Sequence, residues 1–187
     1  MKLARSIVIS MMLTLTAVSA GAEDDGTAMP GHSPYAGLEK RSVKALSDQD
    51  LADLRAGRGM GLALTAELNG YPGPRHVLDL ADQLQLTARQ RAKTQGLFNA
   101  MKAETIPIGG RIMADEMTLD RLFADHRITP ETLHDLTARI GAAQGELRAA
   151  HLRYHLSMMK VLSPAQVAHY VALRGYGAGS HPTETMH

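Results

Sequence analysis

The strongest constraint on the fold is a repeat of apolar residues in the second half of the chain. Between residues 130 and 161 apolar side chains recur mostly three or four positions apart, at Leu133, Leu136, Ile140, Ala143, Leu147, Ala150, Tyr154 and Val161. This spacing places one apolar stripe along an α-helix, as in the seam of a coiled coil. We therefore expect a long helix over residues 130–161 that packs against another helix.

A second long helix is predicted over residues 87–125. Pro107 should bend it, because proline removes a backbone donor and crowds the preceding turn. The link between the two long helices, residues 126–129, is short, and Pro130 suits the first position of a helix. Two long helices with so short a link should form an antiparallel hairpin.

The region before this hairpin reads as a set of short helices. Ser47 can cap the first, and two more are expected over residues 60–68 and 75–84. The glycines of residues 57–61 could indicate a phosphate-binding loop, but they follow a helix rather than a strand, which excludes that interpretation. No segment shows sustained strand alternation. The predicted fold class is all-α, with about four main helices.

The N-terminus predicts export from the cytoplasm. Residues 1–22 contain the basic Lys2 and Arg5, an apolar stretch over residues 7–18, and the small residues Ala20-Gly21-Ala22. This layout is typical of a cleavable signal peptide, and the apolar stretch is shorter than the roughly 20 residues that span a bilayer. The alternative is an uncleaved membrane anchor. We expect a periplasmic protein that does not insert into the membrane after cleavage of the signal.

The predicted domain organisation follows from composition. Residues 23–34 and 177–187 are polar and rich in glycine and proline, so both are expected to be flexible. A single helical domain should occupy residues 35–176.

Composition also excludes several classes of function. The chain has no cysteine, which rules out disulfides, thiol catalysis and thiolate metal sites. No basic tract indicates a nucleic-acid partner. No nucleophile–base pair or nucleotide-binding motif stands out, so an enzyme is not expected.

Two turns share one pattern. Leu86-Thr87-Ala88-Arg89-Gln90 and Leu162-Ser163-Pro164-Ala165-Gln166 each place a hydroxyl residue three positions before a glutamine. In this capping box the hydroxyl accepts from the backbone of the first helical turn, and the glutamine reaches back to the backbone of the cap residue. Thr87 and Gln90, and Ser163 and Gln166, are therefore predicted to begin two helices.

In an exported, cysteine-free helical chain, these two boxes resemble the LTxxQ superfamily. That group includes the Spy and CpxP periplasmic chaperones and the metal-responsive proteins ZraP and CnrX. The resemblance covers roughly residues 45–175 and implies a bent, four-helix antiparallel hairpin, often a homodimer, without enzymatic activity. It implies either binding of unfolded clients or binding of a divalent metal through histidine, carboxylate and methionine side chains.

A candidate metal site lies on the second long helix. His151, His155 and Met159 are four residues apart and share one helix face. Imidazole suits zinc, nickel, cobalt or copper, and a thioether favours softer ions. A complete site needs ligands from another helix, and His76, Asp79 and Glu67 are the candidates.

The same residues also have a purely structural interpretation. His151 follows the seam residue Ala150, and His155 follows Tyr154, so both histidines could merely flank the seam. Leu152, Leu156 and Met159 add apolar character outside the seam and form a candidate surface for a client or partner.

The sequence therefore favours a periplasmic, non-enzymatic stress protein of the Spy and CpxP type. Its partners would be unfolded proteins or a membrane-bound sensor. The alternative is a heavy-metal-binding sensor protein that uses the His-x-x-x-His pair.

Overall fold

A computed structural model describes residues 33–176, and within this range the chain is helical without a β-strand. This confirms the predicted all-α class. The helices are η1 Leu38–Lys40, α1 Asp48–Ala56, α2 Leu64–Glu67, α3 Pro74–Asp79, α4 Ala88–Ala124, α5 Pro130–Met158 and α6 Pro164–Leu173. In this part of the chain none of them combines the length and the apolar character needed to cross a bilayer. The predicted signal peptide and the two predicted flexible ends, except residues 33 and 34, lie outside the described residues.

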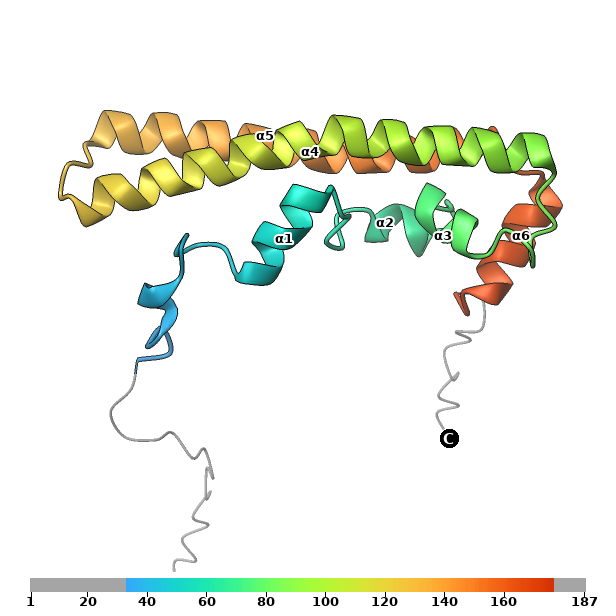
Figure 1. Ribbon diagram of the computed structural model, residues 1–187, viewed down its shortest axis with the longest axis horizontal. Helices are drawn as coiled ribbons and strands as arrows, with labels where there is room; N and C mark the ends of the chain where they lie inside the picture. Colours follow the sequence, from blue (N-terminus) through green and yellow to red (C-terminus); the bar gives the residue numbers. More distant parts are fainter. Residues whose placement is uncertain (1–32, 177–187) are drawn as a thin grey trace, which may run out of the picture. The chain divides into compact units, whose positions relative to one another are not determined.

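The helices α4 and α5 form the predicted hairpin, side by side along most of their length (Figure 1). Pro130 is the first residue of α5, as the sequence indicates, and Thr129 caps the helix. The shared core of this hairpin contains the buried Leu54, Ile108, Ile112, Ala143, Leu147 and Ala150. Most of the predicted seam is confirmed, because Leu136, Ile140, Ala143, Leu147 and Ala150 are all buried.

The helix α4 continues through Pro107, and the residues around this proline receive α1. A Cβ atom on Gly109 would lie 2.7 Å from the backbone oxygen of Leu54, closer than such atoms approach. Only glycine therefore allows α1 to pack this tightly on α4.

The short helices pack along the hairpin. The helix α1 contacts α4, α2 contacts α5, and α3 contacts both (Figure 1). The helix expected over residues 60–68 is shorter, since Met60 and Gly61 have positive φ values of 46° and 75° and α2 begins only at Leu64. The helix expected over residues 75–84 ends at Asp79 and continues as turns.

Both predicted capping boxes are present, and they also contact each other. The side-chain Nε2 of Gln90 donates to Gln166 Oε1 at 2.7 Å and to the Val161 carbonyl at 3.0 Å. The Nε2 of Gln166 donates to the Leu84 carbonyl at 3.1 Å. Each glutamine therefore caps its own helix and donates to a backbone carbonyl just before the other box, which ties the start of α4 to the start of α6.

A second core lies beside these paired boxes. It contains the buried Val77, Ala81, Leu84, Leu86, Met158, Leu162 and Tyr170, so α3, the ends of α5 and α6 meet there. This core holds α6 in place, and α6 in turn carries residues that reach the site described next.

Candidate functional site

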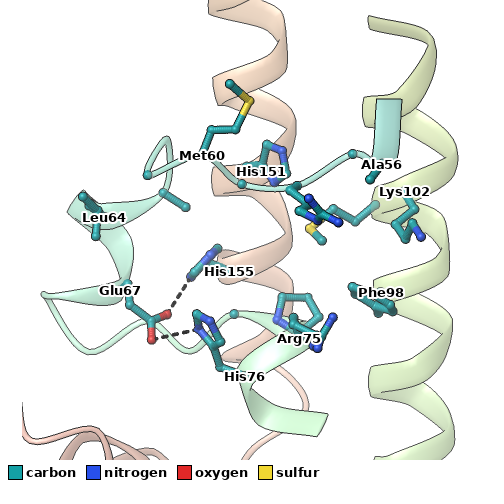
Figure 2. Close-up of a pocket in the computed structure, with 18 residues that line it drawn as sticks. Ala56, Met60, Leu64, Glu67, Arg75, His76, Phe98, Lys102, His151 and His155 are labelled. Carbon is teal, nitrogen blue, oxygen red and sulfur yellow. Dashed lines mark hydrogen bonds and ion pairs between the residues drawn. The ribbon is translucent and has the colours of Figure 1, made fainter. Parts of the chain in front are cut away.

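A cavity of about 520 Å³ opens where the short helices cross the hairpin. Its walls come from the loop after α1, from α2, from the start of α3 and from the facing sides of α4 and α5 (Figure 2). His76, His151 and His155 all line it, so we call it the histidine cavity.

His155 enters the cavity from α5 with its tautomer fixed. Its Nδ1 lies 2.7 Å from the backbone oxygen of Tyr71. Because a carbonyl oxygen only accepts, Nδ1 carries a proton, and in the tautomer that this bond selects the lone pair lies on Nε2. Gly73 makes room for this ring, because a Cβ atom there would lie 2.8 Å from Cε1 and 3.0 Å from Nε2.

His151 lies one turn earlier on α5 and is 2 % exposed. Its Nε2 is buried and has no hydrogen-bond partner, while Nδ1 faces the loop at Gly59. Burial and the neighbouring His155 lower the pKa of His151, against the opposing effects of a backbone hydrogen bond at Arg58 and the charge of Glu104. The ring is therefore neutral at physiological pH, with an unused nitrogen.

Glu67, at the end of α2, is buried next to these histidines. Its Oε1 accepts hydrogen bonds from the Tyr170 hydroxyl and, at 3.2 Å, from His76 Nδ1 and the Tyr176 hydroxyl. Arg174 Nε lies 3.2 Å from the same oxygen. We call these five residues the Glu67 cluster. It neutralises the buried carboxylate with donors from α3, from α6 and from the turn after α6.

The charge state of the cluster follows from these contacts. Burial raises the pKa of Glu67. The hydrogen bonds from His76, Tyr170 and Tyr176 and the charge of His76 outweigh this effect and lower the pKa to about 2. Burial and the adjoining carboxylate raise the pKa of Tyr170. Glu67 is therefore ionised and Tyr170 is protonated throughout the physiological range.

His76 is oriented in the same way as His155, by an oxygen acceptor at Nδ1. Its Nδ1 donates to the Glu67 carboxylate, and its Nε2, on a half-exposed ring, has no hydrogen-bond partner in the described part of the chain. Glu67 is therefore an orienting partner of His76. Glu67 Oε2 lies 3.8 Å from His155 Nδ1, an ion-pair contact that Figure 2 marks with a dashed line, and within residues 33–176 this oxygen has no hydrogen-bond partner.

The structure separates the sequence-predicted metal candidates. His76, His151 and His155 line one cavity, whereas Met159 lies at the end of α5, is 38 % exposed and is absent from its walls. Asp79 pairs with Arg75 on the exposed side of α3.

The two histidines of α5 are buried on the covered face of the helix, a position that both interpretations of the sequence allow. His151 and His155 are buried, while Tyr154, assigned to the seam, is only half-buried and donates to Glu104 at 2.9 Å. The two histidines are buried through tertiary packing, because α2 and α3 cover their side of α5.

Within residues 33–176 no three histidine, aspartate or glutamate side chains converge closely enough to hold a metal ion. The cavity nevertheless fits a metal in part. Metal-binding histidines usually donate one ring N–H to a backbone carbonyl or a carboxylate and present the other nitrogen. His155 and His76 have this arrangement, and His151 presents a buried, unpartnered nitrogen.

The candidate client surface lies on another side of α5. Leu156 is 57 % exposed and Met159 is 38 % exposed, while Leu152 is half-buried. Their spacing of four and three residues places them on one helix face. These three residues form a small apolar strip next to the covered histidine face.

Comparison with known proteins gives one match. A family model described as heavy-metal resistance matches residues 59–169, which run from the loop before α2 into α6 and include the three histidines of the cavity and Glu67. No curated protein and no solved structure matches the chain.

Proposed function

This chain belongs to the heavy-metal resistance family, within the LTxxQ superfamily, and from that premise we propose that it is a periplasmic protein that binds a divalent transition metal in the histidine cavity. His151 and His155 are the proposed first ligands. The protein acts without catalysis, as a metal-responsive binding protein.

The observation that carries this proposal is the orientation of the two α5 histidines. Tyr71 holds Nδ1 of His155, and Nδ1 of His151 faces the Arg58–Gly59 backbone, so each ring keeps Nε2 for a ligand. A buried nitrogen without a partner is costly unless something binds it. Neutral imidazoles favour zinc, nickel, cobalt or copper over magnesium and calcium.

The Glu67 cluster supplies the support for such a site. Glu67 orients His76, whose Nε2 is a third available nitrogen in the same cavity. A carboxylate that accepts the N–H of a ligating histidine raises the basicity of that ring and fixes its direction.

Calorimetry with zinc, nickel, cobalt and copper tests the proposal. The variant His151→Ala/His155→Ala should lose at least about tenfold in affinity for the metal that the wild type binds. The matched control is His134→Ala/His169→Ala, because both of these histidines are exposed. Circular dichroism verifies that each variant keeps its helices. Equal affinity in the wild type and the cavity variant would refute the proposed ligands.

A second candidate function is favoured by the exposed strip of Leu152, Leu156 and Met159. Exposed apolar residues on one helix face bind unfolded segments or an amphipathic partner, and methionine adapts to varied partners. In this version the protein protects unfolded clients or binds a membrane-bound sensor, as a homodimer.

Light scattering of a denatured substrate tests the client version. Wild-type protein should suppress aggregation, and Leu156→Ser/Met159→Ser should suppress it less. Leu133→Ser is the control, since Leu133 is also exposed but lies near the other end of α5. Absence of suppression by a several-fold excess of wild-type protein would exclude this function. Sedimentation analysis of the same samples measures the oligomeric state.

A further inference from the structure

Charge is distributed unevenly along the hairpin of α4 and α5. The half that adjoins α6, made of residues 83–103 and 147–176, contains no aspartate or glutamate, and the acidic residues of the hairpin all lie in residues 104–146. The cations of the acid-free half are Arg89, Arg91, Lys93, Lys102, Arg148, Arg153, Lys160 and Arg174. The end of the hairpin at α6 is therefore basic.

Only some of these cations are available to a partner. Three pair with carboxylates, namely Arg91 with Asp82, Arg153 with Glu104 and Arg174 with Glu67. Lys102 faces the histidine cavity, and Arg148 lies against Thr65. Arg89, Lys93 and Lys160 are exposed and have no ion pair within residues 33–176. These three cations therefore keep their attraction for an external anion.

Helix geometry places the three unpaired cations on the same side of the hairpin. Lys93 lies eleven residues before Glu104, which is about three turns of α4. Lys160 lies seven residues after Arg153, which is about two turns, and the chain is still helical at Met159, just past the end of α5. Arg153 pairs with Glu104 at 2.8 Å, so the sides of α4 and α5 that carry them adjoin. Arg89, one turn before Lys93, belongs to the same side.

Exposed apolar side chains adjoin these cations. Leu156 is 57 % exposed and lies one turn before Lys160 on the same helix face, and the neighbouring Met159 is 38 % exposed. The short helices cover the side of α5 that carries the histidines and leave this side open (Figure 1). We call Arg89, Lys93, Leu156, Met159 and Lys160 the basic face.

We propose that the basic face binds the headgroups of an anionic phospholipid bilayer, on whose surface the protein lies. Lysine and arginine side chains are attracted to the negative potential of such a surface. Apolar side chains beside them gain by entering the boundary between headgroups and acyl chains. This inference goes beyond the proposed function and does not depend on metal binding.

The layout of the basic face favours a bilayer over an unfolded client. Its charges lie on two adjacent helices and share one sign, so a partner must present negative charge across both helices at once. Anionic headgroups do so in one plane. An extended segment of a client would instead follow the apolar strip of Leu152, Leu156 and Met159 along α5 alone, and it would leave Arg89 and Lys93 without a partner.

Co-sedimentation with vesicles tests this inference. The protein is purified as the mature chain that begins at Glu23, because the predicted signal peptide would itself bind lipid. Vesicles of phosphatidylglycerol mixed with phosphatidylcholine should bind the protein, and vesicles of phosphatidylcholine alone should not. Added NaCl should weaken the binding, because salt screens exposed charges.

Two charge variants locate the contact. Lys93→Gln/Lys160→Gln should weaken binding to the anionic vesicles at least about tenfold, since each cation near such a surface contributes about fivefold. Arg121→Gln/Arg127→Gln is the matched control and should bind like the wild type. It makes the same change in net charge at two exposed positions, near the other end of the hairpin. Circular dichroism verifies that both variants keep their helices.

Three results would overturn this inference. The first is no binding to anionic vesicles, or equal binding to neutral ones. The second is an equal loss in the two double variants, because net charge and not the basic face would then be the cause. The third is a wild-type protein that ignores vesicles while Lys93→Gln/Lys160→Gln suppresses aggregation less, since the face would then bind protein. Metal calorimetry probes other residues, so each of these results leaves the proposed function standing.

Discussion

The Glu67 cluster makes a quantitative prediction about stability in acid. The pKa of Glu67 lies near 2 in the folded protein and near 4.5 in the unfolded chain. A carboxyl group whose pKa is lower in the folded state stabilises the fold fully above 4.5 and loses this contribution as the pH falls toward 2. At about 1.4 kcal/mol per pH unit, the difference corresponds to roughly 3 kcal/mol at neutral pH.

The perturbation is Glu67→Gln, which keeps the shape of the side chain and an oxygen acceptor but removes the charge. At neutral pH the variant should unfold at lower urea concentration, with a loss of up to roughly 3 kcal/mol in the free energy of unfolding. As the pH falls through the range from 4.5 to about 2, the two proteins should converge, because protonation removes the charge from wild-type Glu67 as well.

The assay is urea denaturation followed by circular dichroism at several pH values in that range. Acid effects shared by all the other carboxyl groups cancel in the difference between wild type and variant. Glu146→Gln is the control, because the exposed pair of Glu146 with Arg111 should contribute little at any pH. A stability gap between wild type and Glu67→Gln that does not change with pH would refute the reasoning, since the charge would then not be its source.

Three further predictions concern single contacts, each measured by urea denaturation. Gly73→Ala should displace the adjacent imidazole and cost about 1–3 kcal/mol, whereas Gly96→Ala, whose Cβ atom would meet nothing within 4 Å, should stabilise α4 by about 0.5–1 kcal/mol; equal effects would contradict the close contact. Gln90→Ala and Gln166→Ala should couple by about 0.5–3 kcal/mol in a double-mutant cycle, and simple additivity would show that the two boxes act independently. Tyr170→Phe should cost about 1.5–3 kcal/mol, since it removes a buried hydrogen bond to a carboxylate; unchanged stability would exclude that bond.

The sequence predicts the hairpin because the relevant signals are local. Helical spacing of apolar residues, hydroxyl caps and Pro130 each act within a few positions of the chain, and the structure confirms the elements that they indicate. The short helices were predicted less well. The ends of these helices depend on positive φ values at residues such as Met60. A positive φ value cannot be predicted from the sequence when the residue is not glycine.

The candidate site was predictable only where its geometry is also local. The shared helix face of His151 and His155 follows from their spacing, but their burial depends on α2 and α3, which come from a distant part of the chain. The contacts of Glu67 with Tyr170 and Tyr176 had no sequence signal. They join residues 103 and 109 positions apart, and no periodic pattern connects them.

Those long separations set an order of assembly. The hairpin closes over a link of a few residues, whereas Glu67 meets Tyr170, Arg174 and Tyr176 only after α6 has docked, and contacts distant in sequence form late because the intervening chain must first be ordered. A chain truncated before α6 would keep the hairpin but bury an acid without Tyr170, Arg174 and Tyr176. The Glu67 cluster is therefore complete only once the chain has been translated as far as Tyr176.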